Sequence, residues 1–434
     1  MKQTEFKRRR SRLMEIMGKN SIAILPSASA LTRNRDVNFP FRQDSDFLYL
    51  TGFNEPDAVM VLIPGRKHGE YLLFCRKKNP EQEIWHGRRA GQQGAIKNYG
   101  ADDSFPITDL DDIFPGLLEG TGKVFNIMGR YPDFDKRLIG WVRDIREQSR
   151  SGLKVPSEFG ALEYILHDMR LFKSREELRL MRQAACISVE AHKRAMTVCS
   201  VGQHEYQIHA EFDYLFRQHN AQHAYPAIVG GGANSCILHY TDNNKLLKDG
   251  DLLLIDAGCE VQGYAADITR TFPVNGKYST AQREIYDIVL EAQLAAIKAV
   301  KPGNHWDDPH NAAVQMITKG LIELKLLQGD PKKLIKEQAY RRFYMHRTGH
   351  WLGLDVHDVG DYKVGNQWRL LEPGMVLTVE PGIYIPTDDK GIPRKWRGIG
   401  IRIEDDVLVT ANGHEILTDA LPKKADEIEA LMAA

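Results

Sequence analysis

The stretch Leu252-Leu-Leu-Ile-Asp256-Ala-Gly258 places a carboxylate at the end of an apolar run of strand length. Such a strand is buried, and an unpaired buried carboxylate is costly. Asp267 follows in Gly263-Tyr-Ala-Ala-Asp267-Ile-Thr-Arg-Thr271, a second strand after glycine-containing turns. A hairpin would set the two carboxylates side by side, where both can ionise comfortably only with a cation between them. The pattern predicts a cation site. The alternative is that each aspartate has a partner of its own, with Arg270 forming an ion pair with Asp267.

Two further acidic residues repeat this pattern near the C-terminus. Glu380 ends the apolar run Val376-Leu-Thr-Val-Glu380, and the following Pro381 stops the strand. Glu404 lies within Ile399-Gly-Ile-Arg-Ile-Glu404, where period-two alternation puts Arg402 and Glu404 on one face. An Arg402–Glu404 ion pair is the plain interpretation of that face, and the functional interpretation keeps this pair and adds a metal.

Histidines gather in His346-Arg-Thr-Gly-His350-Trp-Leu-Gly-Leu-Asp-Val-His357. The spacing of the first two is that of a helical zinc pair, but Arg347 stands where that motif needs glutamate and Gly349 weakens a helix. We therefore reject a helical zinc protease and expect a site in a loop. Four buried carboxylates with one imidazole favour two divalent ions, about 3.5–4 Å apart, of manganese, cobalt or iron.

The organisation of the chain indicates two domains. Apolar runs at 21–26, 58–63 and 71–75 predict strands of a small α/β domain, residues 1–172. Ser174-Arg-Glu-Glu177 has the pattern of a capping box and predicts a helix that begins a second domain, residues 173–434. In that domain we expect further helices near 205–218, 281–300 and 314–326 among short strands, an α+β arrangement.

Composition narrows the class of protein. The 434 residues contain 58 Lys plus Arg and 58 Asp plus Glu, so overall charge favours neither nucleic acid nor an anionic membrane as a partner. No apolar run has the length of a signal peptide or a membrane span. The 5 cysteines are scattered and form no Cys-x-x-Cys pair. We expect reduced thiols in a cytoplasmic protein.

Several motifs together resemble the "pita-bread" metallopeptidases and, among them, the bacterial proline-specific aminopeptidase P family. Those in the second half are Ile237-Leu-His239-Tyr, Leu254-Ile-Asp256-Ala-Gly, Asp267-Ile-Thr-Arg-Thr-Phe, His350-Trp-Leu-Gly-Leu-Asp-Val-His357, Val379-Glu380-Pro-Gly and Gly400-Ile-Arg-Ile-Glu404-Asp-Asp. Phe41-Arg-Gln-Asp-Ser-Asp-Phe47 and Tyr49-Leu-Thr-Gly-Phe53 extend the resemblance to nearly the whole chain. It implies a pita-bread catalytic domain behind a smaller creatinase-like N-terminal domain that serves oligomerisation and substrate access.

The resemblance also implies a cofactor, two divalent ions with Mn²⁺ expected. Asp256 would chelate one ion, Asp267 and Glu404 would bridge both, and His350 and Glu380 would complete the other. A bridging hydroxide would then attack the carbonyl before a proline in the second position of a peptide (Xaa-|-Pro-Yaa). A homotetramer is the implied assembly, and no nucleic-acid or membrane partner is expected.

Further roles follow from the same resemblance. Glu380 would shuttle the proton, while His357 and His239 would steady the tetrahedral intermediate. The residues implied to border the substrate are His346 at the proline pocket, Arg402 behind the metal site, Trp85 and Arg150. Arg347 stands where the family often has a small residue, so subsite preference is expected to differ.

Four other functions compete with this interpretation. Prolidase has the same fold and metals but cleaves only Xaa-Pro dipeptides, and methionine aminopeptidase normally lacks so large an N-terminal domain. A non-enzymatic binding module and a creatinase-type, metal-free hydrolase use the same scaffold but lose ligands. All five ligand positions are intact here, which disfavours the last two.

Overall fold

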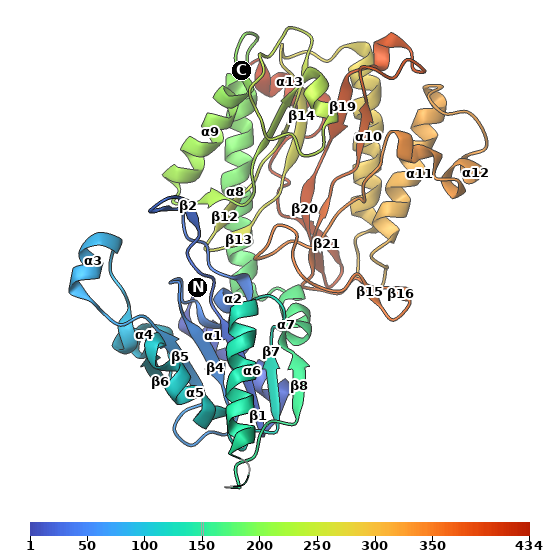
Figure 1. The fold of residues 1–434 in the computed structure, drawn as a ribbon. Helices are drawn as coiled ribbons and strands as arrows, with labels where there is room; N and C mark the ends of the chain where they lie inside the picture. The colour runs from blue at the N-terminus through green and yellow to red at the C-terminus, as the bar shows by residue number, and fades with distance from the viewer. Residues whose placement is uncertain (149, 151) are drawn as a thin grey trace. The chain divides into compact units, whose positions relative to one another are not determined.

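The chain folds into two units, Met1–Met169 and Arg170–Ala434, called here the N-terminal and C-terminal units. This computed structural model describes residues 1–148, 150 and 152–434. Both units combine helices with strands (Figure 1), so the predicted mixture of α and β structure is confirmed. Among the described residues, no helix has both the length and the apolar character that crossing a bilayer requires.

A six-stranded sheet in the order β6-β5-β4-β1-β7-β8 forms the centre of the N-terminal unit. Its strands are β1 (Ser21–Pro26), β4 (Val59–Leu62), β5 (Tyr71–Cys75), β6 (Asp103–Pro106), β7 (Lys123–Asn126) and β8 (Glu158–Ala161). The three strands predicted from apolar runs, β1, β4 and β5, are neighbours in this sheet and pair antiparallel. The other three join through parallel pairings.

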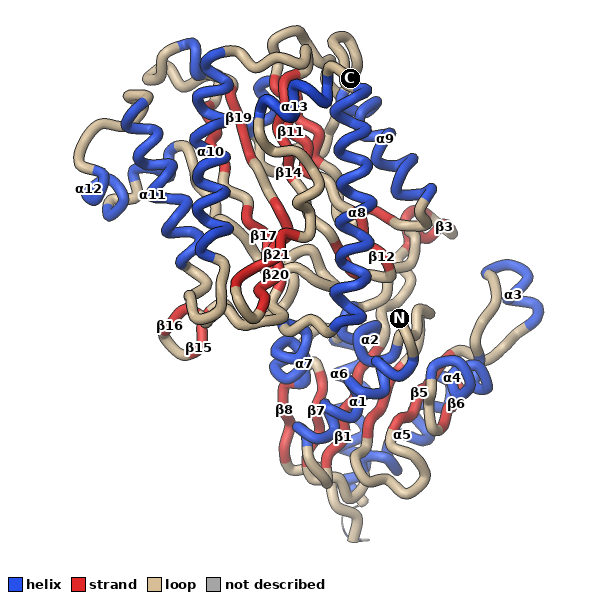
Figure 2. The backbone as a smooth tube through the Cα atoms, turned by 180° about the vertical axis from the view of Figure 1, so that it is seen from behind, coloured by secondary structure: helices blue, strands red, loops and turns tan. Residues whose placement is uncertain are grey.

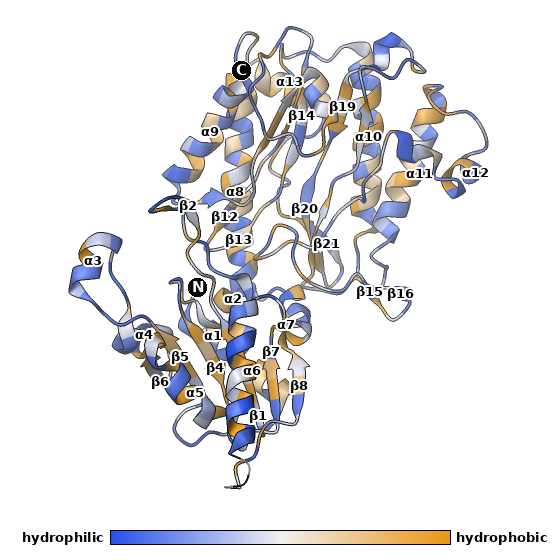
Figure 3. Cartoon of the chain, in the orientation of Figure 1, coloured by the Kyte–Doolittle hydropathy of each residue, from blue (hydrophilic) through white to orange (hydrophobic). Residues whose placement is uncertain are grey.

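Helices and one hairpin complete this unit. The helices are α1 (Gln3–Met17), α2 (Ser45–Thr51), α3 (Pro80–His86), α4 (Gly91–Tyr99), α5 (Leu110–Leu118), α6 (Pro132–Glu147) and α7 (Leu162–Leu171), and the hairpin pairs β2 (Thr32–Asn34) with β3 (Val37–Asn38). Phe114 of α5 stacks on Trp141 of α6 with ring centroids 4.4 Å apart. Hydrophobic colour follows β4, whereas the outer face of α6 is hydrophilic (Figure 3).

The predicted helix is the first helix that lies wholly within the C-terminal unit. Ser174 accepts a hydrogen bond from the Glu177 amide and donates its own amide to the Glu177 carboxylate, so the capping box is confirmed. The helices are α8 (Arg175–Val198), α9 (Glu205–Gln218), α10 (Thr280–Ala299), α11 (Asp308–Glu323), α12 (Pro331–Lys336) and α13 (Ala425–Met432). Helix α11 begins earlier than predicted because Pro309 in its first turn needs no amide partner.

Short antiparallel sheets fill the space beside these helices, in the orders β10-β11-β14, β13-β12-β9, β17-β20-β21, β18-β19 and β15-β16. Their strands are β9 (Gln222–His223), β10 (Ile228–Gly231), β11 (Leu252–Asp256), β12 (Cys259–Val261), β13 (Tyr264–Ala265), β14 (Thr269–Pro273), β15 (Lys363–Val364), β16 (Gln367–Trp368), β17 (Val376–Val379), β18 (Gly382–Ile385), β19 (Ile399–Arg402), β20 (Asp405–Thr410) and β21 (Gly413–Ile416). Helix α8 packs on β12 and β13, and α10 packs on β17, β18 and β19 (Figure 2). Helix α10 therefore backs β17, β18 and β19, the strands beside which the predicted ligands Glu380 and Glu404 lie.

Candidate metal centre

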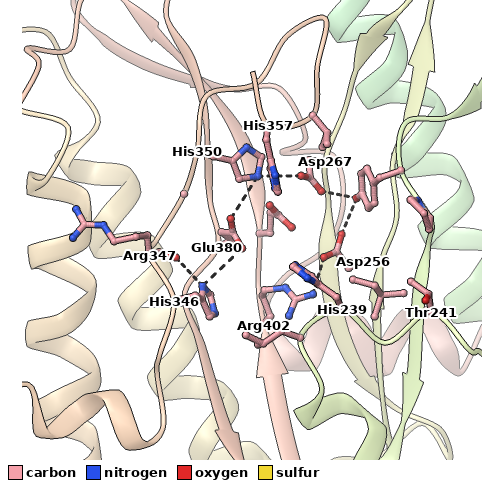
Figure 4. Close-up of a pocket in the computed structure, with 17 residues that line it drawn as sticks. His239, Thr241, Asp256, Asp267, His346, Arg347, His350, His357, Glu380 and Arg402 are labelled. Carbon is pink, nitrogen blue, oxygen red and sulfur yellow. Dashed lines mark hydrogen bonds and ion pairs between the residues drawn. The ribbon is translucent and has the colours of Figure 1, made fainter. Parts of the chain in front are cut away.

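The five predicted metal ligands line one cavity of about 450 Å³ in the C-terminal unit, and four of them are labelled in Figure 4. They are Asp256 at the end of β11, Asp267 just before β14, His350 in the loop before β15, Glu380 between β17 and β18, and Glu404 between β19 and β20. Four of them stand where a strand begins or ends, because there a side chain leaves the buried sheet and can face a cavity. Single ligand atoms of Asp267, His350 and Glu404 lie within 4.8 Å of one another.

Asp256 and Asp267 are neighbours, as the hairpin argument predicted. Strands β11 and β14 pair antiparallel with Asp256 opposite Thr269. The Tyr225 hydroxyl lies 2.7 Å from Asp256 Oδ1 and 2.5 Å from Asp267 Oδ1, although its single proton can serve only one of them. Burial and these carboxylates hold the pKa of Tyr225 well above its usual range, so the tyrosine adds a proton but no positive charge.

The His350 ring faces the carboxylates through one nitrogen. Its Nδ1 lies 2.9 Å from the Trp351 carbonyl and donates to it, which leaves Nε2 3.3 Å from Asp267 and 3.6 Å from Glu380. Burial lowers the pKa of His350, but the hydrogen bond to Asp267 and the charge of Glu380 outweigh it and raise the pKa to about 9. A metal-binding histidine is oriented in the same way, by a hydrogen bond from its second nitrogen.

Glu380 and Glu404 have too little positive charge near them to keep both carboxylates ionised. Burial raises the pKa of Glu380 to about 7 despite His350 and Arg402. Burial and the charges of Asp267 and Glu380 hold the pKa of Glu404 well above its usual range. The set therefore binds either protons or cations at neutral pH, and four carboxylates with one oriented imidazole suit divalent metal ions.

Arg402 corrects one expectation from the sequence. Its guanidinium pairs with Asp256 at 2.7 Å and donates to the Tyr384 hydroxyl at 3.0 Å. Glu404 instead accepts a hydrogen bond from the Thr269 hydroxyl at 2.6 Å. The Arg402–Glu404 ion pair was wrong because β19 ends at Arg402, so period-two alternation does not continue to Glu404.

Arg270 corrects a second expectation. It pairs with Asp405 at 2.8 Å and donates to the Glu404 carbonyl at 2.6 Å, and its side chain is fully buried. Arg270 points away from the cavity because it alternates with Thr269 along β14, and Thr269 faces Glu404. The alternative in which Arg270 neutralises Asp267 was therefore wrong, and Asp267 remains without an arginine partner.

Three more histidines line the cavity: His239, His346 and His357. His346 Nε2 lies 2.9 Å from the Tyr384 hydroxyl, and burial lowers its pKa to about 3. The His357 ring stands edge-on to His350 with centroids 4.3 Å apart, and burial and the His350 charge lower its pKa. His346 and His357 therefore favour the neutral form, in which each ring can donate one hydrogen bond and accept another.

Comparison with known protein families agrees with this geometry. Residues 179–411 match metallopeptidase family M24, and residues 6–125 match the aminopeptidase P N-terminal domain. The chain belongs to metallopeptidase family M24. A protein of Escherichia coli (strain K12) called Xaa-Pro aminopeptidase is 47% identical over 432 residues, which are 99% of this chain and 98% of that one. The Xaa-Pro aminopeptidase of Haemophilus influenzae is 44% identical over 429 residues, 99% of this chain and 97% of that one.

Solved structures of family members superpose on the whole chain. The Pseudomonas aeruginosa aminopeptidase PepP has a TM-score of 0.99 at 58% sequence identity and covers 100% of this chain and 98% of its own. Proline aminopeptidase P II from Yersinia pestis has a TM-score of 0.97 at 47% identity and covers 100% of both chains. The expected two-part fold, with an M24 domain after an aminopeptidase P N-terminal domain, is confirmed.

Sequence reasoning missed three side chains of this M24 site: Tyr225, Thr269 and Tyr384. Tyr225 joins the two aspartates, Thr269 holds Glu404, and Tyr384 connects Arg402 with His346. Period-two alternation does not connect Thr269 with Asp267, because β14 begins only at Thr269. The partners of the two tyrosines are remote along the chain, so the sequence carries no signal for these three side chains.

Two predicted substrate residues, Trp85 and Arg150, lie in the N-terminal unit, whereas the residues that line the cavity all belong to the C-terminal unit. Trp85 is on α3 and 80% exposed, and Arg150 is also exposed. The structure therefore does not bring these two into the cavity lining of the C-terminal unit. Their roles stay predictions.

Proposed function

We propose that the protein is a Xaa-Pro aminopeptidase, which removes the first residue of peptides with proline in second position. The observation that carries this proposal is the cavity in which Asp256, Asp267, His350, Glu380 and Glu404 converge. Family membership makes the protein a metallopeptidase, and the relatives described above supply the preference for proline. Prolidase, the second candidate, is less well supported because those relatives, matched along nearly their whole length, are called aminopeptidases.

The cofactor in this proposal is a pair of divalent ions, with Mn²⁺ preferred. The five ligands named above would hold them, and oxygen donors with a single imidazole favour Mn²⁺ over a thiolate-type zinc site. Bound ions would polarise the scissile carbonyl and activate water. Arg402 keeps Asp256 in place, Thr269 keeps Glu404 in place, and the Trp351 carbonyl keeps His350 in place. The chain itself thus orients the ligands.

Other side chains around the cavity would transfer the proton, stabilise the oxyanion and border the substrate. Glu380 would receive a proton and return it to the leaving amine, since it lies beside both His350 and His346. His357 and His239 would donate hydrogen bonds to the oxyanion of the tetrahedral intermediate. His346, held by Tyr384, would border the pocket for the proline ring. Arg402 would fix the rear wall of the site.

The N-terminal unit, in this proposal, assembles a homotetramer and controls substrate access. Ile84 and Trp85 on α3 are 82% and 80% exposed, and large exposed apolar side chains close together favour contact with another chain. Trp85 and Arg150 would then contact substrate in the assembled enzyme. Light scattering of Trp85→Ala against wild type tests the assembly: the proposal predicts a tetramer mass for wild type, and a monomer at micromolar concentration would refute it.

We also propose that the protein works in the cytoplasm. All five cysteines are free, and two of them, Cys75 and Cys259, are buried. Burial raises the pKa of Cys259 to about 12, so this thiol stays protonated and unreactive. Fractionation of cells that express a tagged chain would test the location.

A substrate series tests the activity. Purified protein loaded with Mn²⁺ is incubated with an Xaa-Pro-Yaa tripeptide, the matching Xaa-Pro dipeptide and a tripeptide without proline, and products are identified by mass spectrometry. Release of the first residue from the proline tripeptide alone, with Asp267→Ala inactive, is the expected result. Cleavage of only the dipeptide would indicate prolidase. Absence of cleavage despite bound metal would overturn the proposal.

A further inference from the structure

A second group of metal-ligating side chains lies outside the cavity, on α9 and β9. His209 and Asp213 are one helical turn apart on α9, and His223 ends β9. One ligand atom of each lies within 4.8 Å of the others. The His223 Nε2 atom is already 2.9 Å from Asp213 Oδ1. None of the three belongs to the ligand set described above.

The protonation state of His223 suits a ligand better than an ion pair. Burial lowers the pKa of His223 even though the hydrogen bond to Asp213 opposes it. The imidazole is therefore neutral at physiological pH, and an uncharged ring gives the Asp213 carboxylate no countercharge. The Nδ1 atom of His223 is buried without a hydrogen-bond partner. The ring is held instead by edge-on packing against His209 and Phe216, with centroids 5.3 Å and 4.8 Å away.

We propose that His209, Asp213 and His223 form an auxiliary site for a borderline divalent cation such as Zn²⁺ or Co²⁺. Two imidazoles and one carboxylate are the donor set that these ions bind, with water in the open position. Ligand atoms about 2.0–2.2 Å from a common ion lie roughly 3–3.5 Å apart, so the observed spacing needs side-chain shifts on the order of 1 Å. The ion takes the place of the proton between His223 Nε2 and Asp213, and the neutral ring keeps its single proton on Nδ1, the nitrogen without a hydrogen-bond partner.

The surroundings make the site both accessible and rigid. The Asp213 side chain is 63% exposed, which leaves an open approach for a hydrated ion. His209 is fixed by its helix, and its contact with Asn243 is a long one of 3.4 Å, so exchanging it for a metal bond costs little. A turn of helix and a paired strand thus present three donors with little conformational freedom left to lose.

A short stretch of backbone connects the auxiliary site with residues that line the catalytic cavity. Strand β9 pairs with β12, and the Ala224 amide donates to the Gly258 carbonyl, two residues after Asp256. The next two residues, Tyr225 and Pro226, line the cavity. A cation on His223 would therefore tie down the segment that carries Tyr225, and stabilise it against local unfolding.

The test measures metal binding rather than peptide cleavage, so its outcome is independent of the proposed function. The double variant His350→Ala/Glu404→Ala removes two of the five catalytic ligands, and Zn²⁺ is titrated into it by calorimetry. We expect one equivalent of Zn²⁺ with a micromolar Kd. Adding His223→Gln or His209→Gln should weaken binding at least tenfold.

His219→Gln is the matched control, because His219 closes the same helix but lies 3.5 Å from Glu190, away from the cluster. It should leave the Kd unchanged. Circular dichroism shows whether each variant folds, and His209→Gln serves if His223→Gln does not. Zn²⁺ binding that is unaffected by both cluster substitutions, or no binding in the double variant, would overturn the proposal.

Discussion

Replacing Asp358 with Asn should strongly destabilise the C-terminal unit. Asp358 accepts from Arg170 at 2.6 Å and from Lys173 at 3.0 Å, and these three side chains are at most 3% exposed. The amide keeps the shape of the carboxylate but leaves two buried cations. Arg170 retains Asp355 at 2.7 Å, whereas the Lys173 ammonium retains only a 3.4 Å contact with the Leu171 carbonyl. Removing one partner of a buried ion pair costs about 3–5 kcal/mol.

Calorimetry of metal-loaded protein measures this effect. At about 2–4 °C per kcal/mol for a unit of this size, the transition of the C-terminal unit should fall by roughly 10 °C. Asp355→Asn is the matched control, because Asp355 is 39% exposed and its pair with Arg170 should contribute less than about 1 kcal/mol. Lys173→Met in the Asp358→Asn background removes the stranded charge and should regain part of the loss. A double variant less stable than Asp358→Asn would refute the reasoning.

The pH dependence of the same variant provides a second check. Burial raises the pKa of Asp358, but Lys173 and Arg170 outweigh it and hold the pKa below its usual range. The stabilisation is therefore complete above the unfolded pKa of about 3.9 and is lost as pH falls through the folded pKa. In urea unfolding, the gap between wild type and Asp358→Asn should be constant from pH 8 to about 5 and narrow below pH 4. A gap that widens on acidification would contradict this sign.

Three further outcomes are expected. Thr269→Val removes the 2.6 Å hydrogen bond to Glu404 and should weaken Mn²⁺ binding by about 10–100-fold in calorimetric titration, while Thr269→Ser should not. Burial lowers the pKa of His310 to about 4, whereas the unfolded chain protonates this histidine near pH 6.5. The free energy of unfolding is therefore unaffected by His310 above pH 6.5 and decreases as the pH falls from 6.5 to 4. His310→Gln should therefore lose less stability than wild type between pH 7 and 4.5 in urea unfolding; equal losses would exclude this role. Chelation should lower the melting temperature of Mn²⁺-loaded wild type by more than it lowers that of Asp267→Ala, since ligands that bind only the folded state stabilise it.

Much of the fold could be predicted because local rules decided it. Helix α8 starts at a Ser174–Glu177 capping box, and β1, β4 and β5 follow uninterrupted apolar runs. The acidic ligands could be found for a related reason. A carboxylate that ends a buried run is costly, so its presence at the end of β11, or after β17, marks a place where something must bind it.

The partners of the charged groups could not be predicted, because they depend on how strands meet in space. Thr271 of β14 exchanges hydrogen bonds with the backbone of Arg402 in β19, although the two are far apart in sequence. This crossing brings Arg402 to Asp256 and Thr269 to Glu404. Period-two alternation describes one strand at a time, so it assigned Arg402 to the nearer acid, Glu404.

Adjacent acids in one run show how the chain separates structural from metal-binding carboxylates. Asp405 pairs with Arg270 at 2.8 Å and Lys423 at 2.7 Å, and these cations outweigh burial and hold its pKa well below the usual range. Glu404, one residue earlier and equally buried, has a hydroxyl partner in Thr269, and its pKa is raised. Because burial is the same, the difference lies in the supply of cations. The fold neutralises Asp405 from within and leaves Glu404 for an ion from solution, which is what a metal centre requires.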